Sequence, residues 1–182
     1  MKRIFLSAFA IIAGTALFAQ QQTYTENYPS GVKRCEGFYN SAVSISENDS
    51  KEVRAQKMAN AVRVGKWSYW HENGQLLAEQ YYGNDGAMTG VWKSWYKDGK
   101  QEFVVDFATG NSTFWFQNGQ KFEEGKMLPG MVKDGAWVGY YESGKKNYEG
   151  SYKNGQKEGT WNWYDEQGKL YYIEKWHNGV KE

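Results

Sequence analysis

Aromatic and glycine residues recur along the chain in one fixed pattern. The pattern is glycine, any residue, tryptophan, two further residues, an aromatic residue, three further residues and a second glycine. It fits five times, and only Ser112 departs from it, in a tryptophan position. A period of about 20 to 25 residues indicates a repeat architecture in which each unit is one supersecondary element. The five matches begin at Gly65, Gly90, Gly110, Gly135 and Gly159.

Each unit is predicted to form two antiparallel strands. Asn-Gly and Asp-Gly between aromatic runs favour tight hairpin turns in which both central residues have positive φ. The first turns end at Gly74, Gly99, Gly119, Gly144 and Gly168. The returning strand ends, eight residues later, on Tyr82, Phe107, Met127, Tyr152 and Trp176. Second turns are predicted at Asn84–Gly86, Thr109–Gly110, Asp134–Gly135, Asn154–Gly155 and Asn178–Gly179.

The regions outside the complete units are less regular. Residues 28–39 align with 141–152, so a repeat domain over 28–182 begins with a half unit, and the polar residues 20–27 are predicted to be a flexible lead. An insertion at about 41–64 interrupts the repeat. Asp49 with Glu52 three residues later is expected to cap a short helix through Ala61, although similarity of 57–67 to 126–137 would make its second half a strand. Residues 178–182 are expected to turn without returning, which leaves an open sheet edge carrying Lys175, Lys181 and Glu182.

Two aromatic columns run through the repeats. Trp67, Trp92, Trp137 and Trp161 form one column, and three residues later come Trp70, Trp95, Trp115, Tyr140 and Tyr164. Successive side chains of a strand point to opposite faces, so the two columns should lie on opposite faces. One column is expected to form the core, and the other is expected to form a partly solvent-exposed face. The second column, which has polar neighbours, is the candidate binding surface; the alternative is a packing layer between hairpins. Exposed rings in such a row would stack on sugars or receive apolar residues of a peptide.

Composition supports an all-β fold. Aromatic residues make up 18% of the 182 residues, with nine Trp and fourteen Tyr beside 21 Gly. Rings fill pleated, half-buried surfaces and glycine supplies the positive φ of hairpin turns. A single hairpin buries too little surface to be stable, so the units must stack. The predicted fold is an elongated single sheet of stacked antiparallel β-hairpins.

The N-terminal segment indicates export. Lys2 and Arg3 precede the apolar run Ile4–Phe18, and Ala19 offers a small residue at a cleavage site. The run is shorter than the roughly 20 residues that span a bilayer. We therefore expect residues 1–19 to be a cleaved signal peptide, no transmembrane segment after cleavage, and a periplasmic or extracellular mature protein.

Charge and cysteine content narrow the possible partners. The chain has 22 basic and 21 acidic residues. Without Lys2 and Arg3 the basic count is 22 − 2 = 20, which gives a formal charge of −1 and no basic field for nucleic acid. Cys35 is the only cysteine, so no internal disulfide is possible, and it is expected to be a small buried hydrophobic residue.

No catalytic or metal-binding motif is recognisable. The two histidines, His71 and His177, lie at turns, and no spacing resembles a zinc site, a nucleophile elbow or a phosphate loop. The acidic pairs Glu123-Glu124 and Asp165-Glu166 lie at or near turns and are expected to be solvated. We therefore predict no catalytic residues, no cofactor and no metal site, and a protein that is not an enzyme.

The segment 148–161, Tyr-Glu-Gly-Ser-Tyr-Lys-Asn-Gly-Gln-Lys-Glu-Gly-Thr-Trp, resembles a MORN repeat, and the longer unit through Gly168 resembles the bacterial MORN variant of YwqK-type antitoxin-component proteins. The resemblance covers about residues 28–182 apart from the insertion. It implies an elongated, solenoid-like sheet of hairpins that binds proteins or lipid headgroups. An antitoxin against a cytoplasmic toxin would not carry an export signal, so the chain departs from the family's name in this respect.

The leading functional hypothesis is a protein-interaction module in the cell envelope. The family resemblance supports toxin neutralisation as an alternative. A second alternative is binding of cell-wall carbohydrate through the rows of rings.

Overall fold

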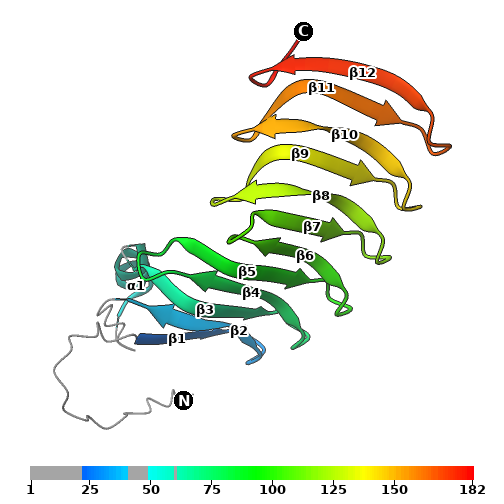
Figure 1. The fold of residues 1–182 in the computed structure, drawn as a ribbon. Coiled ribbons are helices and arrows are strands. Elements are labelled where there is room, and N and C mark those ends of the chain that lie inside the picture. The colour runs from blue at the N-terminus through cyan, green and yellow to red at the C-terminus, as the bar shows by residue number, and fades with distance from the viewer. Residues whose placement is uncertain (1–21, 41–48, 60) are drawn as a thin grey trace.

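The computed structural model describes residues 22–40, 49–59 and 61–182. They form one open antiparallel sheet of thirteen strands, in which each strand pairs with its neighbours in sequence (Figure 1). This confirms the predicted all-β stack of hairpins, to which one helix, α1 (Lys51–Ala59), is added. The strands are β1 (Gln22–Asn27), β2 (Lys33–Tyr39), β3 (Arg63–Trp70), β4 (Leu76–Tyr82), β5 (Met88–Trp95), β6 (Gln101–Asp106), β7 (Asn111–Trp115), β8 (Lys121–Leu128), β9 (Val132–Tyr140), β10 (Lys146–Lys153), β11 (Gln156–Tyr164), β12 (Leu170–His177) and β13 (Val180–Lys181).

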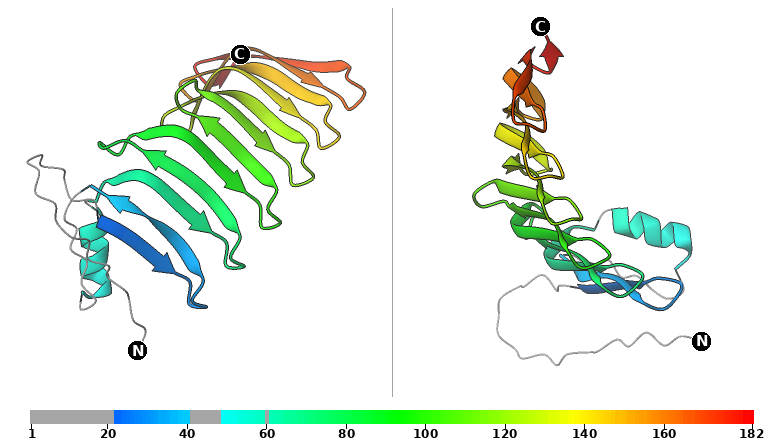
Figure 2. Two further views of the ribbon diagram at one scale, coloured as in Figure 1. Left: turned by 60° about the horizontal axis from the view of Figure 1, so that its bottom comes forward. Right: turned by 90° about the vertical axis from the view of Figure 1, so that its right-hand side faces the viewer.

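The sheet is elongated and twisted, with the N-terminal strands at one end and β12 and β13 at the other (Figure 2). Helix α1 lies to one side of the N-terminal strands. The closest associations between described elements are all between sheet neighbours. The strands are therefore held by their ladders and by side chains packed along each face of a single layer.

The Gly-x-Trp motif forms a bulge at the start of the first strand of a unit. In β3, Ser68 faces Glu36 and Val64 faces Phe38, so Gly37 alone faces the three residues Gly65–Trp67. Gly65 has a φ of +64°, which an L side chain adopts only with strain. Equivalent register shifts occur where β5 meets β4, β9 meets β8 and β11 meets β10. The first glycine of the repeat thus allows the backbone to form a bulge within a strand.

Each bulge lays its tryptophan ring across the neighbouring strand. A Cβ atom added to Gly37 would lie 2.2 Å from the Trp67 ring, and one added to Gly150 would lie 2.2 Å from the Trp161 ring. Each indole N–H also donates to a backbone carbonyl of that strand, from Trp67 to Phe38 at 3.1 Å and from Trp161 to Ser151 at 3.2 Å. In three of the four bulges a glycine of the neighbouring strand, Gly37, Gly125 or Gly150, makes room for the ring, whereas Gln80 stands at this place beside Trp92.

These tryptophans form the core. We call the face that carries them face A and the opposite face, which carries the second aromatic column, face B. Trp67, Trp137 and Trp161 are 1% exposed and Trp92 is 3% exposed. Their rings pack against other aromatic rings of face A, as Trp161 does against Tyr152 at a centroid distance of 5.0 Å. Cys35, which has no disulfide partner, is buried on this face as predicted.

The turns differ from the predicted type. At the first turn, the Gly74 N–H donates to the His71 carbonyl and the His71 N–H donates to the Gln75 carbonyl, both at 2.8 Å. Gly74 has positive φ, but Asn73 does not. This is the three-residue loop in which a turn is followed by a left-handed glycine, and the equivalent hydrogen bonds recur at Gly31, Gly99, Gly119, Gly144 and Gly168.

Some of the turns at the other end of the strands have positive φ at both central residues, whereas the turn at Gly86 is again of the three-residue kind. Asn154 and Gly155 have φ of 50° and 82°, and Asn178 and Gly179 have 47° and 76°. The turn predicted at Asp134–Gly135 was wrong, because Gly135 is the bulge glycine inside β9. The chain instead turns at Gly130 and Met131, which both have positive φ.

The segment predicted as a flexible lead forms an edge strand instead. Residues 22–27 are β1, which pairs along β2. Tyr24 explains the difference, because its ring packs 5.6 Å from that of Tyr39 and 5.9 Å from that of Trp67. Residues 20 and 21 and the expected signal peptide lie outside the described residues.

The insertion and the C-terminus also need corrections. Helix α1 ends at Ala59, and its cap is Ser50, whose Oγ accepts from the Val53 N–H at 3.3 Å, while Asp49 forms an ion pair with Lys57. Residues 41–48 are outside the described part. At the C-terminus the chain does return, because β13 pairs with Trp176 and His177.

Candidate binding faces

The candidate column lies on face B. Because Trp67 and Tyr69 stack on face A, Trp70 points the other way, as the three-residue spacing predicts. All five side chains of the column are half-buried: they are more exposed than the core tryptophans and less exposed than the turn residues. Each faces the first residue of the next strand on the same face: Trp70 faces Leu76, Trp95 faces Gln101, Trp115 faces Lys121, Tyr140 faces Lys146 and Tyr164 faces Leu170.

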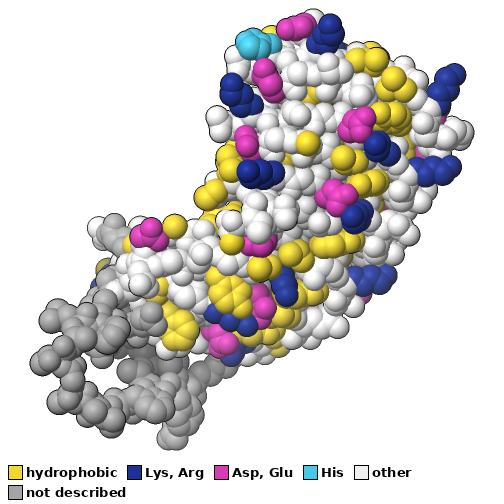
Figure 3. All heavy atoms as spheres, in the orientation of Figure 1, with side chains coloured by type: hydrophobic (Ala, Val, Ile, Leu, Met, Phe, Trp, Pro, Cys, Tyr) yellow, Lys and Arg dark blue, Asp and Glu magenta, His cyan; other side chains and the backbone are white. Residues whose placement is uncertain are grey.

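Lysine and glutamate side chains flank the tyrosines of this column. The Tyr140 hydroxyl donates to Glu124 at 2.6 Å, and Lys121 pairs with the same carboxylate at 2.7 Å. One unit later, the Tyr164 hydroxyl donates to Glu149 at 2.5 Å. Burial and the Glu124 carboxylate raise the pKa of Tyr140 to about 12. Figure 3 shows a face on which hydrophobic side chains form a band across successive strands with acidic and basic side chains beside them. The column is therefore set in a mixed apolar and charged surface.

Glu149 gives face B a testable pH dependence. Hydrogen bonds from Lys146 and then Tyr164 lower the pKa of Glu149 from 4.5 to about 2. A carboxylate whose folded-state pKa is lowered stabilises the fold above its unfolded pKa, and this contribution is lost as pH falls through the folded value. We expect the difference in free energy of unfolding between wild type and Glu149→Gln to be largest above pH 5 and to shrink toward zero as the pH falls to about 2.

Urea unfolding across this pH range measures that difference. Glu142→Gln, at an exposed turn position, controls for the loss of one negative charge. A difference that stayed constant from pH 6 to pH 2 would contradict the role assigned to the Glu149 carboxylate.

A ladder of side chains ties each first turn to the column of the next hairpin. The first residue of the turn reaches the backbone carbonyl of the following column residue, and no spacing in the sequence indicated this role. These side chains donate to the carbonyls as follows: Tyr28 to Trp70 at 2.9 Å, His71 to Trp95 at 2.9 Å, Tyr96 to Trp115 at 2.7 Å and Tyr141 to Tyr164 at 2.7 Å. The exception is Phe116, whose side chain has no donor that could reach the Tyr140 carbonyl. His71 thus has a structural contact in which its Nε2–H donates.

Face A contains ion pairs that the sequence reasoning missed. Glu123 was expected to be solvated but is 7% exposed. Its carboxylate accepts from Lys133 and from the Tyr148 hydroxyl, both at 2.6 Å. The Tyr148 ring lies over Gly139, where an added Cβ would approach the ring to 2.1 Å, so the absence of a side chain there lets the phenol reach Glu123.

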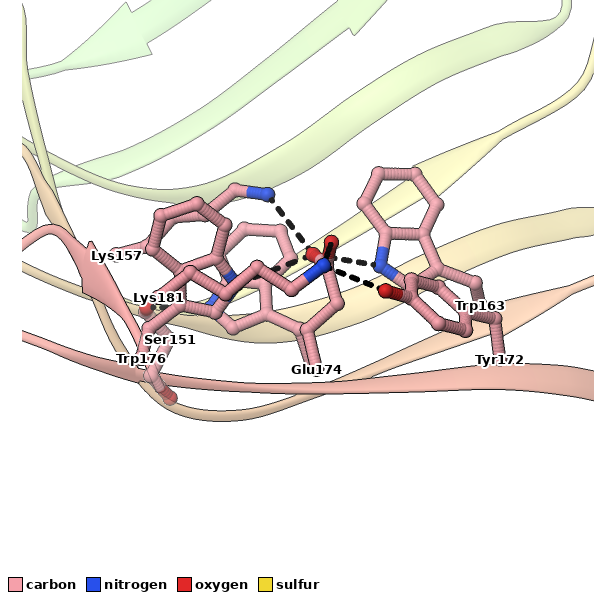
Figure 4. A network of polar contacts seen from close by, with 8 residues as sticks. Ser151, Lys157, Trp163, Tyr172, Glu174, Trp176 and Lys181 are labelled. Atoms are coloured by element: carbon pink, nitrogen blue, oxygen red, sulfur yellow. Dashed lines mark hydrogen bonds and ion pairs between the residues drawn. The ribbon is translucent and has the colours of Figure 1, made fainter.

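A second such network surrounds Glu174 at the C-terminal end of the sheet (Figure 4). The carboxylate accepts from Trp163 and Trp176 at 3.1 Å each and from Lys181 at 3.0 Å, and Lys157 lies at 3.5 Å. Burial acts to raise the pKa of Glu174, but the hydrogen bonds from Lys181 and the two indoles outweigh it and lower the pKa to about 2. Each network neutralises a cation that covers the aromatic core.

In residues 22–40, 49–59 and 61–182, no group of three or more His, Cys, Asp or Glu side chains is arranged to hold a metal ion. No helix in these ranges has the length and apolar character needed to cross a bilayer.

Three segments match the family model described as the MORN repeat variant: residues 63–84, 133–154 and 157–178. They coincide with the hairpins β3–β4, β9–β10 and β11–β12. No curated protein sequence matches the chain. Among solved structures, a chain of the crystal structure of the GtfA/B complex bound to UDP and GlcNAc is similar over 76% of this chain and 25% of its own length, at 12% identity and a TM-score of 0.25. Three hairpins of this chain are thus similar to the MORN repeat variant.

Proposed function

We propose that the protein is an exported, non-enzymatic binding protein of the cell envelope that uses face B to bind a protein partner. MORN repeats are generally associated with binding. The observation that carries the proposal is the column of half-buried rings on face B, set among paired lysines and glutamates on a single-layer sheet. Export rests on the N-terminal signal-like segment.

The chemistry of face B suits a protein partner. Tyr and Trp contribute a large share of binding energy at protein interfaces because they bury much surface with few rotatable bonds. The adjacent Lys121–Glu124 and Lys146–Glu149 pairs provide the polar groups that surround such anchors and set orientation. Interfaces of this mixed kind are typical of proteins that also exist unbound.

Regular ring spacing supports a second candidate. Column residues of successive units are two strands apart, which corresponds to about 10 Å. Rings at a constant spacing would suit a linear polymer with a regular repeat, such as a wall polysaccharide, because sugar rings stack on aromatic faces.

The test uses the purified mature protein and an envelope preparation separated into protein, polysaccharide and lipid fractions. It measures which of these fractions retains the protein. We expect retention by the protein fraction and its loss in the double variant Trp95→Ala/Tyr140→Ala. Tyr171→Ala is the matched control, because Tyr171 is a 59% exposed ring outside the column. Circular dichroism verifies that the variants are folded.

The other outcomes decide between the proposals. Retention by polysaccharide that requires the column would replace the protein partner with a wall polymer. Retention that survives the double variant would show that the column is a packing layer, and absence of retention by any fraction would overturn the proposed function.

A further inference from the structure

A basic side chain on face A lies over the core tryptophan in each of the three hairpins that match the family model. It stands four residues before the tryptophan, at the first residue of the matched segment. Lys133 lies 4.2 Å from the Trp137 ring centroid, Lys157 lies 4.3 Å from that of Trp161, and the Arg63 guanidinium lies 4.9 Å from that of Trp67.

The two lysines share a second feature that Arg63 lacks. Lys133 is paired with Glu123 at 2.6 Å, and Lys157 lies 3.5 Å from Glu174. Within the described part of the chain, Arg63 has no carboxylate at ion-pair distance, and it donates to the Tyr82 hydroxyl at 3.4 Å. One of three equivalent cations is therefore without a carboxylate partner among the described residues.

The strand register identifies what replaces the two glutamates beside Arg63. Glu123 faces Gly139 across the ladder, and the equivalent pair in the first unit is Cys35 facing Tyr69. Glu174 faces Trp161, and the equivalent pair is Gln80 facing Trp67. A neutral residue thus stands at both positions that supply a carboxylate elsewhere in the sheet.

A hollow of about 310 Å³ opens at this place. Its lining includes Cys35, Arg63, Trp67, Tyr69 and Leu77. The small residue Cys35 lines the hollow, and Ala78 faces Tyr69 at the position where the larger Phe103 and Tyr148 stand in later hairpins.

The Tyr69 hydroxyl gives the hollow an unused donor. Its oxygen is buried and has no hydrogen-bond partner among the described residues, whereas the Tyr148 hydroxyl donates to Glu123. Burial raises the pKa of Tyr69, and the nearby Arg63 charge opposes part of this shift. Glu26 also lines the hollow; one oxygen of its carboxylate pairs with Arg34 at 3.0 Å, and the other accepts from the Tyr24 hydroxyl at 3.5 Å. Arg63 therefore presents a cation without a carboxylate partner among the described residues, and Tyr69 presents a hydroxyl without an acceptor.

We propose that this hollow binds a carboxylate group of a ligand, which takes the place beside Arg63 that Glu123 takes beside Lys133. The guanidinium pairs with the carboxylate, an arrangement that a planar cation favours. The Tyr69 hydroxyl donates to the same group, and the body of the ligand packs against Trp67 and Leu77. The carboxylate comes from an acidic peptide or from a sugar acid. The site lies on face A and does not depend on the proposed function of face B.

Calorimetric titration of the full chain with N-acetyl-glutamate and with glucuronate tests the site and distinguishes the two sources. We expect saturable binding of one of the two, and little binding of N-acetyl-glutamine or glucose. Arg63→Gln should weaken binding by about tenfold or more, and Tyr69→Phe by several-fold, because each removes a hydrogen bond to a charged group. Lys97→Gln, the same charge change at an exposed turn, should bind like wild type.

A further variant supplies the missing carboxylate within the chain. Cys35→Glu places an acidic side chain at the position equivalent to Glu123, and it should abolish binding by occupying the site. Arg63→Gln and Tyr69→Phe decide the matter if Cys35→Glu does not fold. The proposal is overturned if neither carboxylate binds the wild-type protein, or if both of these variants bind as tightly as wild type.

Discussion

Replacement of Trp137 by alanine is expected to lower the free energy of unfolding by about 3–5 kcal/mol. The ring is 1% exposed, lies across Gly125 and donates its N–H to the Lys126 carbonyl at 3.1 Å. It also lies beneath Lys133, whose ammonium is 4.2 Å from the ring centroid. The substitution would remove the largest side chain from a core only one layer deep, so little surrounding structure can collapse into the cavity.

Denaturant unfolding followed by circular dichroism measures this loss. Trp115→Ala is the matched control, since Trp115 is the half-buried ring of the opposite face. Trp115→Ala should lower the free energy of unfolding clearly less than Trp137→Ala, because folding removes less of the Trp115 ring surface from water. Equal losses at the two positions would contradict the assignment of face A as the core.

The second large effect is expected from Gly150→Ala. The added Cβ would lie 2.2 Å from the Trp161 ring, in the space that this ring occupies. The ring would have to leave its place above β10, and overpacking of this kind costs about 1–3 kcal/mol. Because Gly150 does not have positive φ, the loss would come from packing and not from backbone strain.

Gln80→Ala provides the comparison for Gly150→Ala. Gln80 takes the corresponding place on the strand before Trp92, and it already carries a Cβ. Its replacement should change the thermal midpoint little. If Gly150→Ala proved as stable as Gln80→Ala, the close fit of ring and glycine would not be a source of stability.

The repeat columns allowed most of the fold to be predicted. The turn glycines predicted the returning strands. Side-chain alternation predicted that the two aromatic columns lie on opposite faces, because Trp67 and Trp70 are three residues apart. Turn geometry was harder, because a left-handed glycine ends both kinds of hairpin loop. Hydrogen bonds such as that from His71 to the Gln75 carbonyl distinguish them, and they depend on the pairing register.

The chemistry of face A could not be predicted for a related reason. The Gly-x-Trp bulges place three residues opposite one, so partners across strands do not stand at a constant separation in sequence. Glu123 was assigned to solvent because it lies near a turn, whereas the register brings it to Lys133 and Tyr148. The column on face B could be located because it repeats in every unit, but the periodicity encodes no ligand.

The ladder between turns and column residues has one break, and this gives the molecule a mechanical weak point. Phe116 replaces the donor that would reach Tyr140, and the adjoining strand β7 has only five residues, with Ser112 in place of the core tryptophan. Tyr96 ties β7 to the preceding hairpin, and Tyr141 ties the β9–β10 hairpin to the following one. A bending or twisting load along the stack would therefore be taken up first between the β7–β8 and β9–β10 hairpins, so that the two halves move as stiffer segments about a compliant joint.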